Sequence, residues 1–131
     1  MAFEYKMLVL MTVFLLLAFI PSSLAKLKTF GGAWIASNRD PLPGTELPAW
    51  GARSERAHAN LKDNLPGFIV AVLLLGIVSK FDHMTAWATG LYVVGRVSHY
   101  FSYIAGNVRI RFLGYILALS TNLFLLAKVF L

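Results

Sequence analysis

Four apolar stretches alternate with polar segments along the chain. A helix of about 20 mostly apolar residues is long enough to cross the hydrocarbon core of a bilayer. On that measure the sequence predicts membrane spans at about residues 6–26, 60–79, 84–105 and 111–131. Because backbone polar groups in lipid must be bonded within the protein, we expect an all-α integral membrane protein. Its single domain, residues 1–131, is predicted to be a four-transmembrane-helix bundle.

The first apolar stretch also has features of a secretory signal peptide. Lys6 precedes the apolar core, and residues 21–25 resemble a small-residue cleavage site. However, the uncharged run from Met7 to Leu24 is long for a signal core, and Glu4 cancels the charge of Lys6. We therefore expect a helix that is retained in the protein.

Composition supports the membrane interpretation. Hydrophobic residues make up 58% of the chain and charged residues 14%, against about 45–50% and 25% in typical soluble domains. The mean hydropathy is +0.68, and a small soluble domain keeps too much of its surface wet to hide so many apolar side chains. The absence of cysteine excludes disulfides, thiolate metal sites and cysteine nucleophiles.

The basic residues indicate an orientation in the membrane. The net charge is +6, and the lysines and arginines gather around a long polar loop, about residues 27–53, and the connection at 107–111. The positive-inside rule places both segments in the cytoplasm and both termini outside it. Since these charges lie between apolar runs and not on the face of a soluble domain, nucleic acid is not an expected partner.

The second predicted helix carries polar side chains on one face. It is expected to begin near Ser54, because serine is a good N-cap residue. Arg56, Asn60 and Asp63 then follow at i, i+4 and i+7, a spacing that places them on the same side. Pro66 is expected to bend the helix just inside the membrane.

The third predicted helix repeats this pattern near the same end of the bundle. Arg96, His99 and Tyr103 are spaced i, i+3 and i+7, and Arg109 and Arg111 follow in the next connection. Polar groups within membrane spans are costly and by default point to a function. The two polar faces together predict a site.

These polar residues have two interpretations. In the first, Arg56 and Asp63 form a salt bridge that holds the bundle, and His99 and Tyr103 bond to backbone carbonyls or lie in the aromatic belt. In the second they bind a ligand: guanidinium groups suit carboxylates and phosphates, and an acid suits an ammonium group. That ligand is a small zwitterionic or polyanionic molecule, with an apolar partner arriving from lipid. The three histidines show no metal-ligand spacing, so no metal is expected.

Two stretches resemble a known family. Residues 56–68, RAHANLKDNLPGF, resemble the second-helix motif of the MAPEG family, the membrane-associated proteins of eicosanoid and glutathione metabolism. Residues 96–103, RVSHYFSY, followed by Gly106 and Arg111, are similar to the third-to-fourth helix signature of that family. The resemblance covers nearly the whole chain and is greatest to short bacterial members, which implies a location in a bacterial inner membrane.

The resemblance implies a homotrimer that holds glutathione, as co-substrate, between neighbouring subunits near the cytoplasmic face. The implied activity is a membrane-bound glutathione transferase, with peroxidase activity as a further option, acting on a hydrophobic electrophile or lipid hydroperoxide. By motif position, the implied glutathione contacts are Arg56, Asn60, Asp63, His99 and Tyr103, and the catalytic residue that stabilises the thiolate is Arg111.

Three positions depart from the family pattern. Asp63 stands where glutamate is usual, Ala59 replaces an arginine of the prostaglandin synthase branch, and Phe112 replaces a small hydroxyl residue. Because fold alone does not fix activity, the alternative function is a non-catalytic membrane scaffold or lipid-binding protein with a degenerate glutathione pocket.

Overall fold

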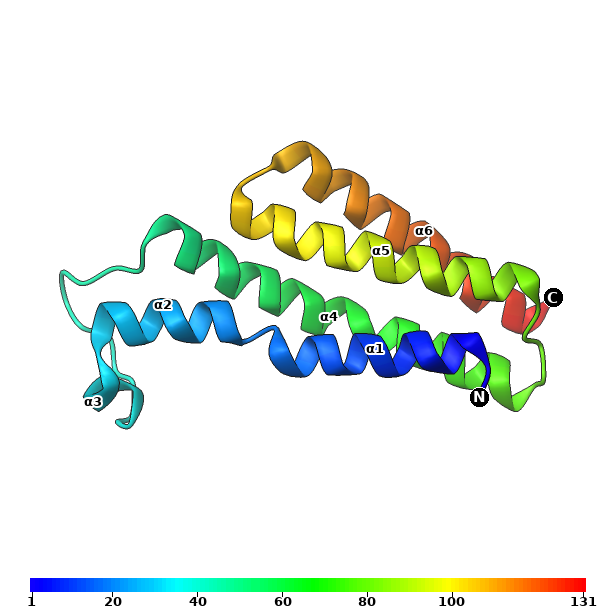
Figure 1. Cartoon of the computed structure of the whole chain (residues 1–131), viewed down its shortest axis with the longest axis horizontal. Coiled ribbons are helices and arrows are strands. Elements are labelled where there is room, and N and C mark those ends of the chain that lie inside the picture. Colours follow the sequence, from blue (N-terminus) through cyan, green and yellow to red (C-terminus); the bar gives the residue numbers. More distant parts are fainter.

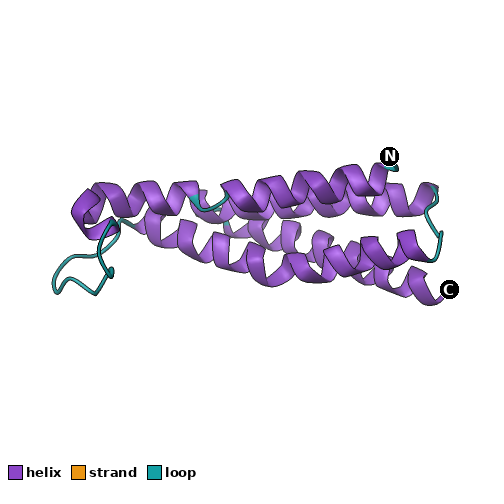
Figure 2. Cartoon of the chain, turned by 90° about the horizontal axis from the view of Figure 1, so that it is seen from below, coloured by secondary structure: helices purple, strands orange, loops and turns teal.

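The computed structural model describes all residues, 1–131, and contains helices but no strand. In the half of the bundle that carries the loop, helix α4 lies between α2 and the hairpin of α5 and α6; it then crosses α1, which contacts both α4 and α5 (Figure 1). Both termini lie at one end of the elongated bundle and the irregular loop at the other, as Figure 2 also shows. The helices are α1 (Phe3–Leu17), α2 (Ile20–Phe30), α3 (Gly32–Ile35), α4 (Ala49–Ile77), α5 (His83–Ala105) and α6 (Val108–Phe130).

Three helical segments are long and apolar enough to cross a membrane: Phe3–Phe30, Ala49–Ile77 and Val108–Phe130. They overlap the first, second and fourth predicted spans, at about residues 6–26, 60–79 and 111–131. Helix α5 has the same 23-residue length as α6, but Arg96 and His99 make it more polar. Both side chains are buried against neighbouring helices. The fold is therefore an all-helical membrane protein, and a fourth span along α5 remains a prediction.

The first predicted span is two helices, not one. Helix α1 ends at Leu17 and α2 begins at Ile20. Pro21 lies in the first turn of α2, where its missing N–H is tolerated. The Tyr100 hydroxyl of α5 donates to the Ala18 carbonyl at 2.6 Å, so the break is held by a neighbouring helix.

The second helix begins earlier than the sequence predicts. Helix α4 starts at Ala49, and Ser54 is not its N-cap but an internal residue whose hydroxyl donates to the Gly51 carbonyl at 2.7 Å. Packing explains the difference: a Cβ on Gly51 would lie only 2.7 Å from Ala25 Cβ, so these turns are in close contact with α2. Because α3 also lies within the predicted loop, the longest stretch of the chain outside a helix is residues 36–48.

Helices α4 and α5 run antiparallel, and their polar atoms are paired at three levels. The three hydrogen bonds run from Arg53 Nε to the Ile104 carbonyl (2.8 Å), from Arg96 Nη2 to Asn60 Oδ1 (2.7 Å), and from the Tyr92 hydroxyl to the Asn64 carbonyl (3.2 Å). One turn of α4 beyond the third level, the Phe68 ring stacks on the Tyr92 ring in the core. The pairing fixes which residues of α4 face α5.

Helices α5 and α6 make the closest helix–helix contact. A Cβ on Gly95 would lie 2.8 Å from the Gly114 carbonyl oxygen, and a Cβ on Gly114 would lie 2.7 Å from the Gly95 carbonyl oxygen. Such close backbone approach by small residues is typical of membrane helix packing. It also places the start of α6 directly against His99 of α5.

Polar contacts close the end of the bundle that bears the termini. Asp82 caps α5 by accepting from the Thr85 N–H at 2.9 Å, and pairs with Lys128 of α6 at 2.8 Å. The hydrogen bond from Lys128, together with that from the Thr85 N–H, lowers the pKa of Asp82 below its ordinary value. The Thr85 hydroxyl donates to the buried Glu4 carboxylate at 2.6 Å, which connects α1 to the same cap.

Candidate functional site

Asn60 and Arg96 meet between α4 and α5. The Arg96 guanidinium is 1% exposed and donates from Nη2 to the Asn60 side-chain oxygen at 2.7 Å and to the Asn60 carbonyl at 3.2 Å. Because a guanidinium has only donors, the oxygen of the Asn60 amide must face it. The amide NH₂ of half-buried Asn60 therefore faces away from Arg96.

Arg96 is a buried cation without an acidic partner. The two ion pairs in the molecule, Lys26–Glu55 and Lys128–Asp82, do not include it. Its Nε and the Asn122 Oδ1 atom have no hydrogen-bond partner in the protein. Both residues line a void of about 20 Å³, enough for one water molecule, which needs about 10–15 Å³. Burial of this charge is costly, and no acid in the protein offsets the cost.

His99, Tyr103 and Arg111 form a second group, at the turn between α5 and α6. His99 Nδ1 lies 2.9 Å from the Arg111 carbonyl, and since a carbonyl only accepts, Nδ1 carries the proton. The Arg111 guanidinium lies over the Tyr103 ring, 4.6 Å from its centroid, a cation–π contact. His99 therefore positions the Arg111 backbone while Tyr103 positions its side chain.

Arg56 and Asp63 are not brought into either group. Both are exposed on α4, and neither takes part in an ion pair. The salt bridge between Arg56 and Asp63 that the first interpretation predicts is therefore not formed within the single chain. Their common face is open in the single chain, which leaves them available to a ligand or to another subunit.

Arg56 lines a polar groove between α2 and α4. The groove has a volume of about 400 Å³ and also contains Lys26, Glu55, His58 and Lys62. Lys26 and Glu55 form an ion pair across it, at 2.6 Å. Besides Arg56, the groove thus combines three basic or ionisable side chains, Lys26, His58 and Lys62, with one acid, Glu55.

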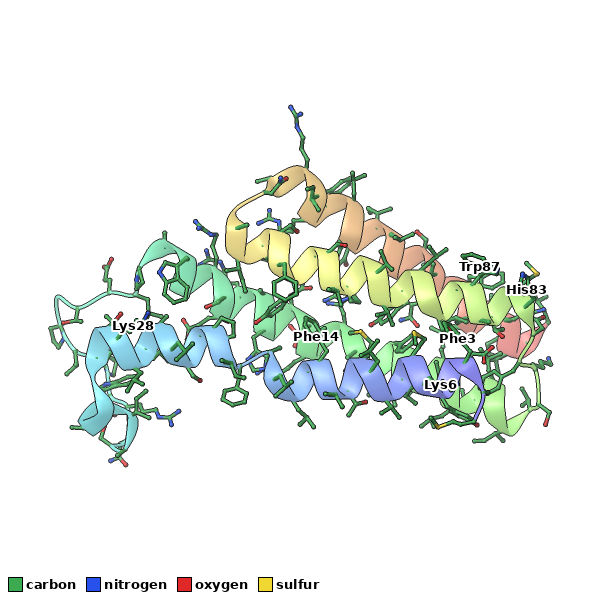
Figure 3. The ribbon with its side chains drawn as sticks, in the orientation of Figure 1. Phe3, Lys6, Phe14, Lys28, His83 and Trp87 are labelled. Atoms are coloured by element: carbon green, nitrogen blue, oxygen red, sulfur yellow. The ribbon has the colours of Figure 1, made fainter.

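The largest groove lies elsewhere. It has a volume of about 530 Å³ between α1 and α5, near the chain termini, and its lining is mostly apolar, including Phe3, Met7 and Trp87. Figure 3 shows Phe3, His83 and Trp87 together at that end, far from Lys28 beside the loop. No group of three or more histidine, aspartate or glutamate side chains lies close enough to hold a metal ion.

Arg96 is absent from the glutathione contacts that the family resemblance implies. Its place in the polar pattern of α5 was visible, but spacing alone did not distinguish a ligand contact from a residue that orients one. What distinguishes Arg96 in the structure is that its side chain is buried and bonds to an asparagine of the neighbouring helix.

These features define an all-helical integral membrane protein with polar groups between α4, α5 and α6 in the half of the bundle that carries the loop. The model of the MAPEG family matches residues 4–131, so the chain belongs to that family, whose members act in glutathione and eicosanoid metabolism. The resemblance noted in the sequence is thereby confirmed. A search of curated proteins finds no match.

Proposed function

We propose that the protein is a membrane-bound glutathione transferase, with four membrane spans, that conjugates the glutathione thiolate to hydrophobic electrophiles from the bilayer. The observation that supports this most is the Arg111 guanidinium. It is half-buried, held over the Tyr103 ring, and free of any ion pair. A cation so positioned is available to an anionic ligand atom.

In the proposed reaction Arg111 stabilises the thiolate of bound glutathione. A thiol becomes a good nucleophile only when deprotonated, and a nearby positive charge favours that form. The thiolate sulfur attacks an electrophilic carbon, a carbon–sulfur bond forms, and the leaving group departs with the bonding electron pair. Tyr103 keeps the guanidinium at the reacting end of the ligand, and His99 holds the turn that carries it.

The remaining proposed contacts hold the ends of glutathione. Arg56 binds a carboxylate, for which its guanidinium is suited, and Asp63 binds the ammonium group. Asn60 offers its outward-facing amide NH₂ to an acceptor of the ligand, since its oxygen is taken by Arg96. These groups face outward from α4, which supports a site completed by a second subunit in a homotrimer. We propose that this site faces the cytoplasm.

Two substitutions test the proposal by their contrast. Arg111→Ala should lose the ultraviolet absorbance of the bound thiolate and most of kcat, with glutathione binding changed only modestly. Arg56→Ala should keep the thiolate absorbance at saturation but weaken binding by about 1.5–3 kcal/mol, the usual value for a hydrogen bond to a charged group. Both are read by titrating the purified protein with glutathione in detergent.

The outcomes separate the two candidate functions. A full thiolate signal in Arg111→Ala would move the activating role to another residue, with Tyr103 the next candidate. A wild-type protein with neither thiolate signal nor glutathione binding would instead be a scaffold or lipid-binding protein, as the departures at Asp63 and Phe112 allow.

A further inference from the structure

A third groove runs along the outer side of α2, next to Ile35 of α3. It has a volume of about 280 Å³. Ala18, Ser22 and Ala25 are the buried residues of this part of the chain, so the groove lies on the side of α2 turned away from the bundle core. Its floor is apolar and faces outward: Phe19, Ile20, Leu24 and Leu27 are all at least 40% exposed.

The groove changes from apolar to basic along the helix axis. Phe19 and Ile20 lie at its inner end, and Lys26 lies about 10 Å further along, given a rise of about 1.5 Å per residue. Arg39, which belongs to the loop, lines the groove together with Lys26. Lys26 is paired with Glu55, so the uncompensated charge at the rim comes from Arg39.

Hydrogen bonds within the loop fix Arg39 but leave the two Nη atoms of its guanidinium free. Its backbone has a φ of 60°, a left-handed conformation that is uncommon outside glycine. The Arg39 N–H donates to the Ser37 hydroxyl oxygen at 3.1 Å, and Nε donates to the Ile35 carbonyl at 3.0 Å. Both Nη atoms remain without a partner in the protein, so the paired donors that suit a phosphate are free.

We propose that this groove binds an anionic phospholipid, with its phosphate on the Nη atoms of Arg39 beside Lys26 and an acyl chain on the floor formed by Ile20, Leu24 and Leu27. The order along the axis, apolar and then cationic, matches that of a lipid lying in one leaflet. If the loop is cytoplasmic, the ligand comes from the leaflet whose anionic lipids attract basic residues. This inference does not depend on glutathione chemistry.

The test compares lipid retention by wild type and two variants that each remove one positive charge. Arg39→Gln removes the groove guanidinium. Lys28→Gln is the matched control, since Lys28 lies at the same end of α2 (Figure 3) but does not line the groove. Each purified protein is equilibrated with equal amounts of phosphatidylglycerol and phosphatidylcholine of identical acyl chains. Native mass spectrometry then counts the lipids that remain bound.

We expect wild type to retain phosphatidylglycerol in preference to phosphatidylcholine. Arg39→Gln should lower that preference about fivefold, the factor that corresponds to about 1 kcal/mol per basic residue near an anionic surface. Lys28→Gln should lower it less. Circular dichroism checks that the variants fold. We expect both to fold, because the Arg39 and Lys28 side chains are exposed. Equal retention of the two lipids by wild type, or equal losses in the two variants, would overturn the proposal.

Discussion

Arg96 is the residue whose surroundings are least explained by stability alone. A buried cation with no acid beside it is unfavourable, and an apolar side chain of similar volume often serves stability as well or better. What Arg96 does determine is the orientation of the Asn60 amide, through the 2.7 Å bond to Oδ1. In the proposed site it is a positioning residue: it makes Asn60 a donor toward the ligand.

This role predicts opposite effects on stability and binding. Arg96→Met should leave the thermal unfolding temperature in detergent unchanged or higher, because a buried charge is removed, yet weaken glutathione binding by about 1 kcal/mol, the usual net value of one hydrogen bond. Calorimetric titration and unfolding scans on the same preparation measure the two effects.

Asn60→Asp is the companion variant. An aspartate keeps the contact to Arg96, now as an ion pair, but it presents no N–H to the ligand. We therefore expect normal stability with glutathione binding weakened by about 1–3 kcal/mol, the usual cost of leaving a buried hydrogen-bonding group without its partner. Wild-type affinity in either variant would show that the orientation of Asn60 does not matter for binding.

At the scale of helices, the contact between α5 and α6 depends on two glycines. A Cβ added at Gly114 would meet backbone atoms of Gly95 and His99 at 2.7 and 2.9 Å, so the helices must separate to accept it. Gly114→Ala should destabilise the protein by about 1–3 kcal/mol, as overpacked cores do. Unfolding in detergent mixtures measures the change.

Gly90 of α5 provides the matched control. A Cβ there would meet only the Phe3 ring, at 3.6 Å, an ordinary contact. Gly90→Ala should therefore be neutral or stabilising by about 0.5–1 kcal/mol, the usual difference between glycine and alanine inside a helix. Equal losses in the two variants would contradict the close contact between α5 and α6.

The cap of α5 gives a pH-dependent prediction. Because the folded pKa of Asp82 is lowered by Lys128 and the Thr85 N–H, its ionised form stabilises the fold above the unfolded pKa, near 3.9. That contribution is lost as pH falls through the still lower folded pKa. Asp82→Asn keeps the capping oxygen but not the charge, so it should show a smaller loss of stability than wild type between pH 5 and pH 3. Thermal scans at each pH compare them, and parallel curves for the two proteins would contradict the role of the ion pair.

The sequence predicted helix positions better than helix ends. Apolar runs located the spans, because the cost of exposing backbone groups to lipid leaves helices as the solution. The start of α4 at Ala49 and the break before Ile20 were missed, since both depend on contacts with other helices: Gly51 on Ala25, and Tyr100 on Ala18. Local propensity contains no information about such partners.

The candidate site was predictable to a similar degree. Spacing on one helix face grouped His99 with Tyr103, and the sequence placed Arg111 in the connection that follows; the structure adds that the Arg111 guanidinium lies over the Tyr103 ring. Spacing did not separate inward from outward positions: Arg96 points into the bundle, and Asp63 is exposed. That distinction depends on how α4 and α5 are rotated against each other, which is set by packing.

For the whole molecule, we predict a homotrimer. Arg56 and Asp63 lie exposed on α4, a helix long and apolar enough to span a membrane, where ionisable groups need protein or water partners. Native mass spectrometry from mild detergent should give the mass of three chains of 14.5 kDa. A stable monomer that still binds glutathione would contradict a site shared between subunits.

The orientation of the bundle can be tested because the chain has no native cysteine. From the positions of the basic residues, the loop that contains Asn38 should lie in the cytoplasm and the C-terminus outside. In intact cells, an impermeant maleimide should label a cysteine after Leu131 but not Asn38→Cys. The reverse pattern of labelling would invert the orientation.

The three-level pairing of α4 with α5 has a consequence for insertions and deletions. One residue inserted in α4 between Arg53 and Asn60 would turn everything after it by about 100° relative to what precedes it. The Ile104 carbonyl and Arg96 could then no longer both find their partners on α4. A residue inserted within 36–48 disturbs neither, because that segment is irregular. Length differences among related chains should therefore occur in this loop and be absent from the paired stretch of α4.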